Sequence, residues 1–147
     1  MGSFSDFLEK KLLDHVWGNT SAVTSGTLYV GLATSTITDA TTGITVVEPP
    51  TTSGGNPTAY ARVAVTNNTT NWPNAAGTSP TTKNNGTAIN FAQCTTNWGT
   101  CTDFFIADTA TVATGSILGF STLTTAKTIS SGDSASFAVN AITITLD

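Results

Sequence analysis

Apolar side chains recur at helical spacing near the start of the chain, in the stretch FSDFLEKKLLDHVW over residues 4–17. The i, i+3, i+4 spacing predicts an amphipathic helix, which Ser3 or Ser5 can cap and Gly18 can end. The apolar positions cover more than one narrow stripe, so we expect the helix to contact two surfaces, its own sheet and a neighbouring subunit. The side chains predicted for this docking role are Phe4, Phe7, Leu8, Leu12, Val16 and Trp17.

After Gly18 the pattern changes to short runs of alternating apolar and polar residues, separated by turn-forming residues. Such runs predict strands, because successive strand side chains point to opposite faces of a sheet. Many short strands with one helix favour a mainly β fold, an antiparallel β-sandwich or jelly-roll-like barrel. We expect a docking helix in residues 1–18 and a single β-sandwich domain in residues 19–147. The predicted strands cover residues 28–33, 60–66, 87–93, 100–107, 116–123, 134–140 and 141–146.

The predicted strand YARVAVT, residues 60–66, has the clearest two-faced pattern. Its alternation places Val63 and Val65 on one face and Tyr60 and Arg62 on the other. The final strand follows the same logic, with isoleucines inward and threonines outward, and is therefore expected to be structural.

Charge is scarce: charged residues make up 10% of the 147-residue chain, against about 25% in an ordinary globular protein. The net charge is −4, and beyond the helix only Arg62, Lys83 and Lys127 are basic. They are far apart in sequence, so we expect no nucleic-acid partner. Acidic residues interrupt the N-terminus, and no apolar run reaches the ~18 residues of a membrane span, so the sequence predicts synthesis in a cytoplasm and no membrane partner.

Reactive groups are also scarce. His15 is the only histidine, and no motif marks a nucleophile or acid that would complete a catalytic site with it. One histidine and two separated cysteines do not make a zinc quartet. Asp108 and Asp133 stand in turn-like contexts, where aspartate commonly bonds nearby backbone. We therefore expect a protein that is not an enzyme and needs no metal or other cofactor, and a hydrolase ranks last among the functions considered.

Cys94 and Cys101 bracket the segment TTNWGT. If that segment joins two antiparallel strands, the cysteines can face one another at disulfide spacing. The alternative is two reduced cysteines that act as small apolar residues. Both alternatives are structural, and the sequence does not choose between them.

Trp72 and Trp98, with Tyr60, are the candidate contacts for a glycan, because aromatic rings can stack on sugar rings. The competing interpretation, which we favour for Trp98, is that its ring closes an open end of the sandwich. A carbohydrate-binding module is therefore an alternative function from another class.

Several stretches, in order, resemble a family of small tailed-bacteriophage virion proteins that are labelled tail fibre or structural protein. They are SDFLEKKLLDHVWGNT, LYVGLATSTITDATTG, YARVAV, AINFAQ, NWGTCTDFFIADTATVATGSILGFSTL and TISSGDSASFAVNAITITLD. The chain departs from the usual form in its cysteine pair and in an insert, residues 67–85, which we expect to be a long exposed loop with an edge strand.

The resemblance implies a non-enzymatic structural protein, made in the bacterial host cytoplasm and displayed on the exterior of the virion. Its implied partners are copies of itself and other virion proteins, such as the major capsid or tail proteins, and a host surface glycan is a further candidate. Because no repeat or heptad predicts an elongated shaft, we prefer a head-decoration or cement protein on the capsid. A tail-fibre or receptor-contact protein is the alternative.

Overall fold

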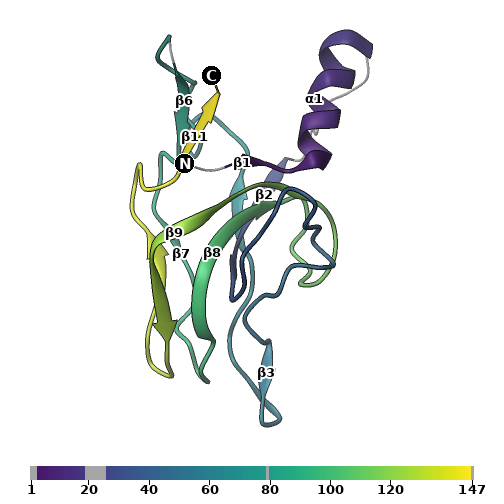
Figure 1. Ribbon diagram of the computed structural model, residues 1–147. Coiled ribbons are helices and arrows are strands. Elements are labelled where there is room, and N and C mark those ends of the chain that lie inside the picture. The colour runs from purple at the N-terminus through teal and green to yellow at the C-terminus, as the bar shows by residue number, and fades with distance from the viewer. Residues whose placement is uncertain (1–2, 19–25, 79, 147) are drawn as a thin grey trace.

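The computed structural model describes residues 3–18, 26–78 and 80–146 of the chain (Figure 1). Over these residues the fold is mainly β, with antiparallel pairing and one helix, α1 (Asp6–Gly18), as predicted. The strands of the described residues are β1 (Ser3–Phe4), β2 (Thr27–Ala33), β3 (Thr52–Ser53), β4 (Asn56–Pro57), β5 (Val63–Thr66), β6 (Thr81–Asn84), β7 (Ile89–Asn90), β8 (Gly99–Ala107), β9 (Ile117–Ile129), β10 (Ser136–Phe137) and β11 (Thr143–Leu146).

Five of these strands form a central antiparallel sheet in the order β1-β9-β8-β2-β5. Strands β2, β8 and β9 are its longest members and are rich in threonine, isoleucine and other residues that suit a pleated surface. In the ladder between β2 and β8, Val30 lies opposite Ile106 and Gly31 lies opposite Phe105. The missing side chain at Gly31 is needed, because a Cβ there would lie 2.2 Å from the Phe105 ring.

Both faces of the central sheet are covered. Phe105 packs into one apolar cluster with Ile37 and Val46, whereas the next residue, Ile106, points into a larger cluster on the opposite face. The two-stranded sheet of β7 and β10 packs on that second face, where the ring of Phe137 lies 5.1 Å from the ring of Phe104. The strands therefore form a sandwich-like arrangement, with α1 projecting from one end and the hairpin of β3 and β4 at the other (Figure 1).

The lengths of the predicted strands differ most from those in the structure where few residues form ladder pairs with a neighbouring strand. Only two residues of the predicted strand 87–93 form β7, and only two of 134–140 form β10. In contrast, β9 extends well past residue 123 to Ile129 because it pairs with β8 along most of its length. The expected edge strand of the 67–85 segment is present as β6, which pairs with β11.

In residues 60–66, the predicted face of Tyr60 is wrong, because it packs in the same cluster as Val65, whereas Arg62 lies over Phe105 of the opposite cluster as predicted. Tyr60 and Arg62 are both 5% exposed, and the strand itself begins at Val63. Residues 60–62 lie outside the ladder with β2. Their polar ends are satisfied inside the protein instead, where Leu32 N–H donates to the Tyr60 hydroxyl and Arg62 pairs with Glu48.

Candidate functional site

Helix α1 is attached to the central sheet at its first turn. The Leu8 N–H donates to Ser5 Oγ at 3.4 Å, so Ser5 caps the helix as predicted. The Ser5 hydroxyl in turn donates to the carbonyl of Ile117 in β9. Because Ser5 is 2% exposed, this bridge anchors the start of α1 in the protein interior.

The rest of α1 carries large apolar side chains into solvent. No residue of the helix is buried, and the exposed fractions are 57% for Leu13, 61% for Val16 and 80% for Trp17. At 3.6 residues per turn these three side chains share an arc of roughly 100°, which we call the outer stripe. An exposed apolar stripe on a helix is typical of an interface with another protein.

The predicted docking residues separate into two groups. Phe4 was predicted within the helix, but it belongs to β1 and pairs with Gly119 of β9. Leu8 packs against the apolar core of the chain's own sandwich, so it serves the fold. Leu12 is half-buried, whereas Phe7, Val16 and Trp17 are exposed. The expectation that Phe4 belongs to the helical docking surface is therefore wrong.

The tryptophans proposed as glycan contacts lie in the core. Trp98 is 1% exposed, and its indole N–H donates to the Thr58 carbonyl at 2.7 Å. Its ring meets the Tyr60 ring edge-to-face, with centroids 5.3 Å apart. Trp72 is 2% exposed. Neither ring presents an open face on which a sugar could stack, and both contribute to the packing of the sandwich instead.

Cys94 and Cys101 are free thiols in the structure, and both are buried. The segments 87–93 and 100–107 are not paired with each other, because β7 pairs with β10 while β8 pairs with β2 and β9. The hairpin on which the disulfide alternative depended is therefore absent from the described strands. Burial, with a smaller contribution from Cys94, raises the pKa of the Cys101 thiol to about 11. This thiol stays protonated and unreactive at neutral pH.

A buried ion pair between Glu48 and Arg62 is the feature that the sequence analysis missed. The Arg62 Nη2 to Glu48 Oε1 distance is 2.7 Å, and the two side chains are 0% and 2% exposed. Glu48 also accepts hydrogen bonds from the Tyr60 hydroxyl at 2.8 Å and from the Ala113 N–H at 3.2 Å. Burial, together with the nearby Glu48 charge, raises the pKa of Tyr60 well above its usual range.

The arginine of this pair joins the β2–β3 loop to the β8–β9 loop. Its guanidinium donates to the carbonyls of Thr109 and Thr114, each at 3.1 Å, and to that of Gly43 at 3.4 Å. It also lies over the Phe105 ring, 5.1 Å from the centroid. Such extensive hydrogen bonding is what allows a charged pair to lie in a protein interior. These contacts tie the guanidinium to the surrounding backbone, which favours a structural role.

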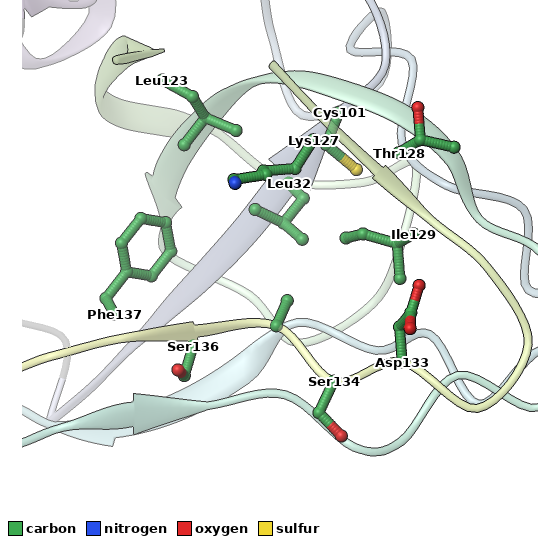
Figure 2. A pocket seen from close by; sticks show the side chains of 11 residues that line it. Leu32, Cys101, Leu123, Lys127, Thr128, Ile129, Asp133, Ser134, Ser136 and Phe137 are labelled. Carbon is green, nitrogen blue, oxygen red and sulfur yellow. The ribbon is translucent and has the colours of Figure 1, made fainter. Parts of the chain in front are cut away.

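A cavity of about 390 Å³ opens between β9 and residues 133–137, and we call it the β9 cavity (Figure 2). Leu32, Ile129 and Phe137 supply apolar walls, while Lys127 and Asp133 supply opposite charges. Within residues 3–18, 26–78 and 80–146, Lys127 makes no ion pair with any carboxylate. Figure 2 shows its amine reaching over Leu32 toward Leu123.

Two further kinds of site are missing from the described part of the chain. There, no group of three histidine, cysteine, aspartate or glutamate side chains is placed to hold a metal ion. None of the helical segments described is both long enough and apolar enough to cross a bilayer.

Asp108 and Asp133 bond nearby backbone N–H groups of Ser116 and Ser130, as predicted.

Comparison with known families gives a match over nearly the whole chain. Residues 3–145 match the family model described as podophage GP4 fiber I protein gp80. Among curated proteins, none matches the chain.

Proposed function

The chain belongs to the family of podophage GP4 fiber I protein gp80, and from that premise we propose that it works as a tail-fibre component attached to the virion through α1. The family places it among the structural proteins of tailed-phage particles. The role in the fibre and the attachment through α1 are our proposals.

The family description favours a tail-fibre protein over the head-decoration protein preferred from the sequence. That preference rested on the lack of a repeat that could build an elongated shaft. A fibre also needs compact parts, such as an adaptor or a tip, and a sandwich-like domain with one projecting helix suits such a part (Figure 1). We therefore assign the chain to a compact component of a fibre.

The outer stripe of α1 is the observation that carries the attachment role. Leu13, Val16 and Trp17 are each more than half exposed, although α1 is anchored through Ser5 to the central sheet. Burying one such side chain in an interface contributes about 1.5–3 kcal/mol. A helix that is fixed at its first turn has already lost much of the freedom that binding would otherwise remove, which strengthens association.

The partners proposed for α1 are other virion proteins, including further copies of this chain. Virions repeat their parts, and repeated copies usually form symmetric contacts. An apolar stripe of three large side chains is small for a stable interface, so we expect the partner to contact the neighbouring strands as well.

Electron microscopy of phage particles with and without this protein tests the proposal. Deletion should remove density from the tail appendages and leave the head surface unchanged, and restoring the protein from a plasmid should restore that density. Loss of a surface feature from the head, with the tail appendages intact, would contradict the proposed role and support head decoration.

A further inference from the structure

Lys127 lies on the same face of β9 as buried residues, although the residue itself is exposed. In the ladder it is directly opposite Cys101, which is 0% exposed, and paired residues share a face. Ile129, two residues further along the same face, is 5% exposed. The lysine therefore lines the β9 cavity while remaining exposed to solvent, and it has no carboxylate partner among the described residues.

A bulge in β9 creates the space for this arrangement. Between the pairs Asp103–Thr122 and Cys101–Lys127, β8 contains one residue whereas β9 contains residues 123–126. Bulges of this kind bend a strand and redirect its side chains, and they are frequent beside binding sites. Leu123, which belongs to this bulge, and Lys127, which follows it, both line the β9 cavity (Figure 2).

The opposite wall is held rigidly. Gly132 N–H donates to the Cys94 carbonyl at 2.7 Å, and Cys94 N–H donates to the Asp133 carbonyl at 2.8 Å. The Ser131 N–H donates to Asn97 Oδ1 at 2.9 Å. Within this turn, Asp133 Oδ2 accepts from the Ser130 N–H at 2.9 Å, which fixes the carboxylate at the cavity. A site whose walls are fixed in advance loses little entropy when a ligand binds.

The two charges restrict the chemistry of a ligand. Lys127 and Asp133 line the same cavity but do not form an ion pair, so a ligand can lie between them. Both residues are exposed, so a ligand can reach them: the ammonium favours an anionic group, and the carboxylate accepts hydrogen bonds from donors. The remaining walls, Leu32, Ile129 and Phe137, require an apolar surface. A sugar ring that carries a carboxylate supplies all three: an anion, several hydroxyl donors and a face of C–H groups.

We propose that the β9 cavity binds a carboxylate-bearing sugar, with Lys127 holding the carboxylate and Asp133 accepting hydrogen bonds from the hydroxyls. The cavity volume of about 390 Å³ lies in the range of roughly 300–1,000 Å³ that is usual for ligand sites. The proposed function supplies the biological source, since a fibre component on a virion would meet such sugars on the host surface. The glycan site proposed here is therefore the β9 cavity and not the buried Trp72 and Trp98.

A competing role for Lys127 is protection of an open sheet edge. Strand β1 pairs with β9 at Gly119 and Phe120, and from Thr122 onward no described strand covers that side of β9. Inward-pointing charges are one means by which proteins prevent exposed edges from pairing with other chains. This role predicts self-association when the charge is removed, and it predicts no sugar binding.

Calorimetric titration of the purified full chain separates these roles. The probes are trigalacturonic acid, the uncharged galactotriose, and a tri-glutamate peptide that carries carboxylates without sugar hydroxyls. We expect trigalacturonic acid to bind and the other two to bind at least roughly tenfold more weakly. Lys127→Met should weaken binding roughly ten- to hundredfold, the usual effect of losing a hydrogen bond to a charged group.

Matched variants test whether sugar binding depends on Lys127 and Asp133. Lys127→Arg keeps the positive charge and should stay within about threefold of the original affinity, and Lys83→Met, which removes the same charge elsewhere, should leave it unchanged. Asp133→Asn keeps an oxygen for the Ser130 N–H and should weaken binding without unfolding the turn. Methyl resonances of Leu32 and Ile129 should shift when the acidic sugar is added.

Three results would overturn the inference: no binding of the acidic sugar, equal binding by Lys127→Met, or preferential binding of the tri-glutamate peptide. Self-association of Lys127→Met in a chain that binds no sugar would assign the lysine to edge protection instead. The titration uses the isolated chain and the imaging test uses particles, so either proposal can fail while the other stands.

Discussion

Helix α1 and the ion pair of Glu48 and Arg62 depart from the usual distribution of polarity in opposite directions. Along the outer stripe of α1, large apolar side chains lie in solvent, with Trp17 80% exposed. At the ion pair, two charged side chains lie in the interior and are 0% and 2% exposed. The buried pair is satisfied by hydrogen bonds within the chain, whereas the outer stripe stays more than half exposed among the described residues.

The ion pair stabilises the fold, whereas the outer stripe is available for assembly with other proteins. Removing one member of a fully bonded buried pair leaves an uncompensated charge, so the fold depends on Arg62. Changing an exposed side chain usually alters stability by less than about 0.5 kcal/mol, so the fold does not depend on Val16 or Trp17. Substitutions in the two regions should therefore affect different measurements.

The largest effect on stability is expected from Arg62→Met. This change leaves the Glu48 carboxylate buried without its partner and removes donors from the carbonyls of Thr109 and Thr114. Breaking a buried pair in this way costs about 3–5 kcal/mol. Urea unfolding followed by tryptophan fluorescence measures the loss. The double variant Glu48→Gln with Arg62→Met should recover part of it, and an unfolding free energy unchanged in the single variant would show that the pair is dispensable.

A smaller loss, about 1–3 kcal/mol, is expected from Gly31→Ala. The new methyl group would lie 2.2 Å from the Phe105 ring, which is fully buried and has little room to move. The same urea titration applies. Combining the change with Phe105→Leu should restore part of the stability, since the smaller side chain makes room for the methyl group; if it does not, the backbone at residue 31 rather than the ring contact is responsible.

Alkaline pH should weaken the fold through Cys101. Its pKa is raised from 9.0 to about 11 in the folded protein, so the folded state keeps a proton that the unfolded state releases. The resulting stabilisation is complete below pH 9.0 and is lost as pH rises toward about 11. Unfolding free energies measured from pH 8 to pH 11 should therefore fall, and Cys101→Ala should make that slope shallower. An identical slope in the variant would assign the alkaline effect to other groups, such as Tyr60.

The smallest effect on stability is expected from Val16→Asp in the outer stripe. Val16 is 61% exposed, so an aspartate there stays solvated, and the unfolding free energy should change by less than about 0.5 kcal/mol. Thermal melts of Val16→Asp and of Lys11→Glu measure this change. Lys11→Glu is the control, because it introduces a carboxylate on another side of the same helix. A large loss confined to Val16→Asp would mean that this side chain packs within its own chain.

The sequence predicted the features that follow a local period. Helical spacing identified α1 and the Ser5 cap, because these depend on neighbours within a few residues. Alternation located β2 and β8 within one or two residues. The family was also recognisable from short motifs spread over the chain.

Features that depend on distant contacts were not predictable in the same way. Arg62 was expected on the face opposite Val63 and Val65, but its burial in an ion pair with Glu48, fourteen positions earlier, was not predicted. Lys127 was simply one of a few scattered basic residues until the β9 bulge and the ladder with Cys101 placed it at a cavity. Register shifts and loop crossings decide such positions, and neither leaves a periodic pattern in the sequence.

Incorporation of α1 variants into phage particles tests the central claim most directly. Copies of the chain per purified particle would be counted by quantitative mass spectrometry for the double variant Val16→Asp with Trp17→Asp, and for Lys11→Glu as the matched control. Our account predicts that the double variant folds normally but is missing from particles, while the control is incorporated at the normal level. Normal incorporation of the folded double variant would show that the outer stripe of α1 is not the attachment surface.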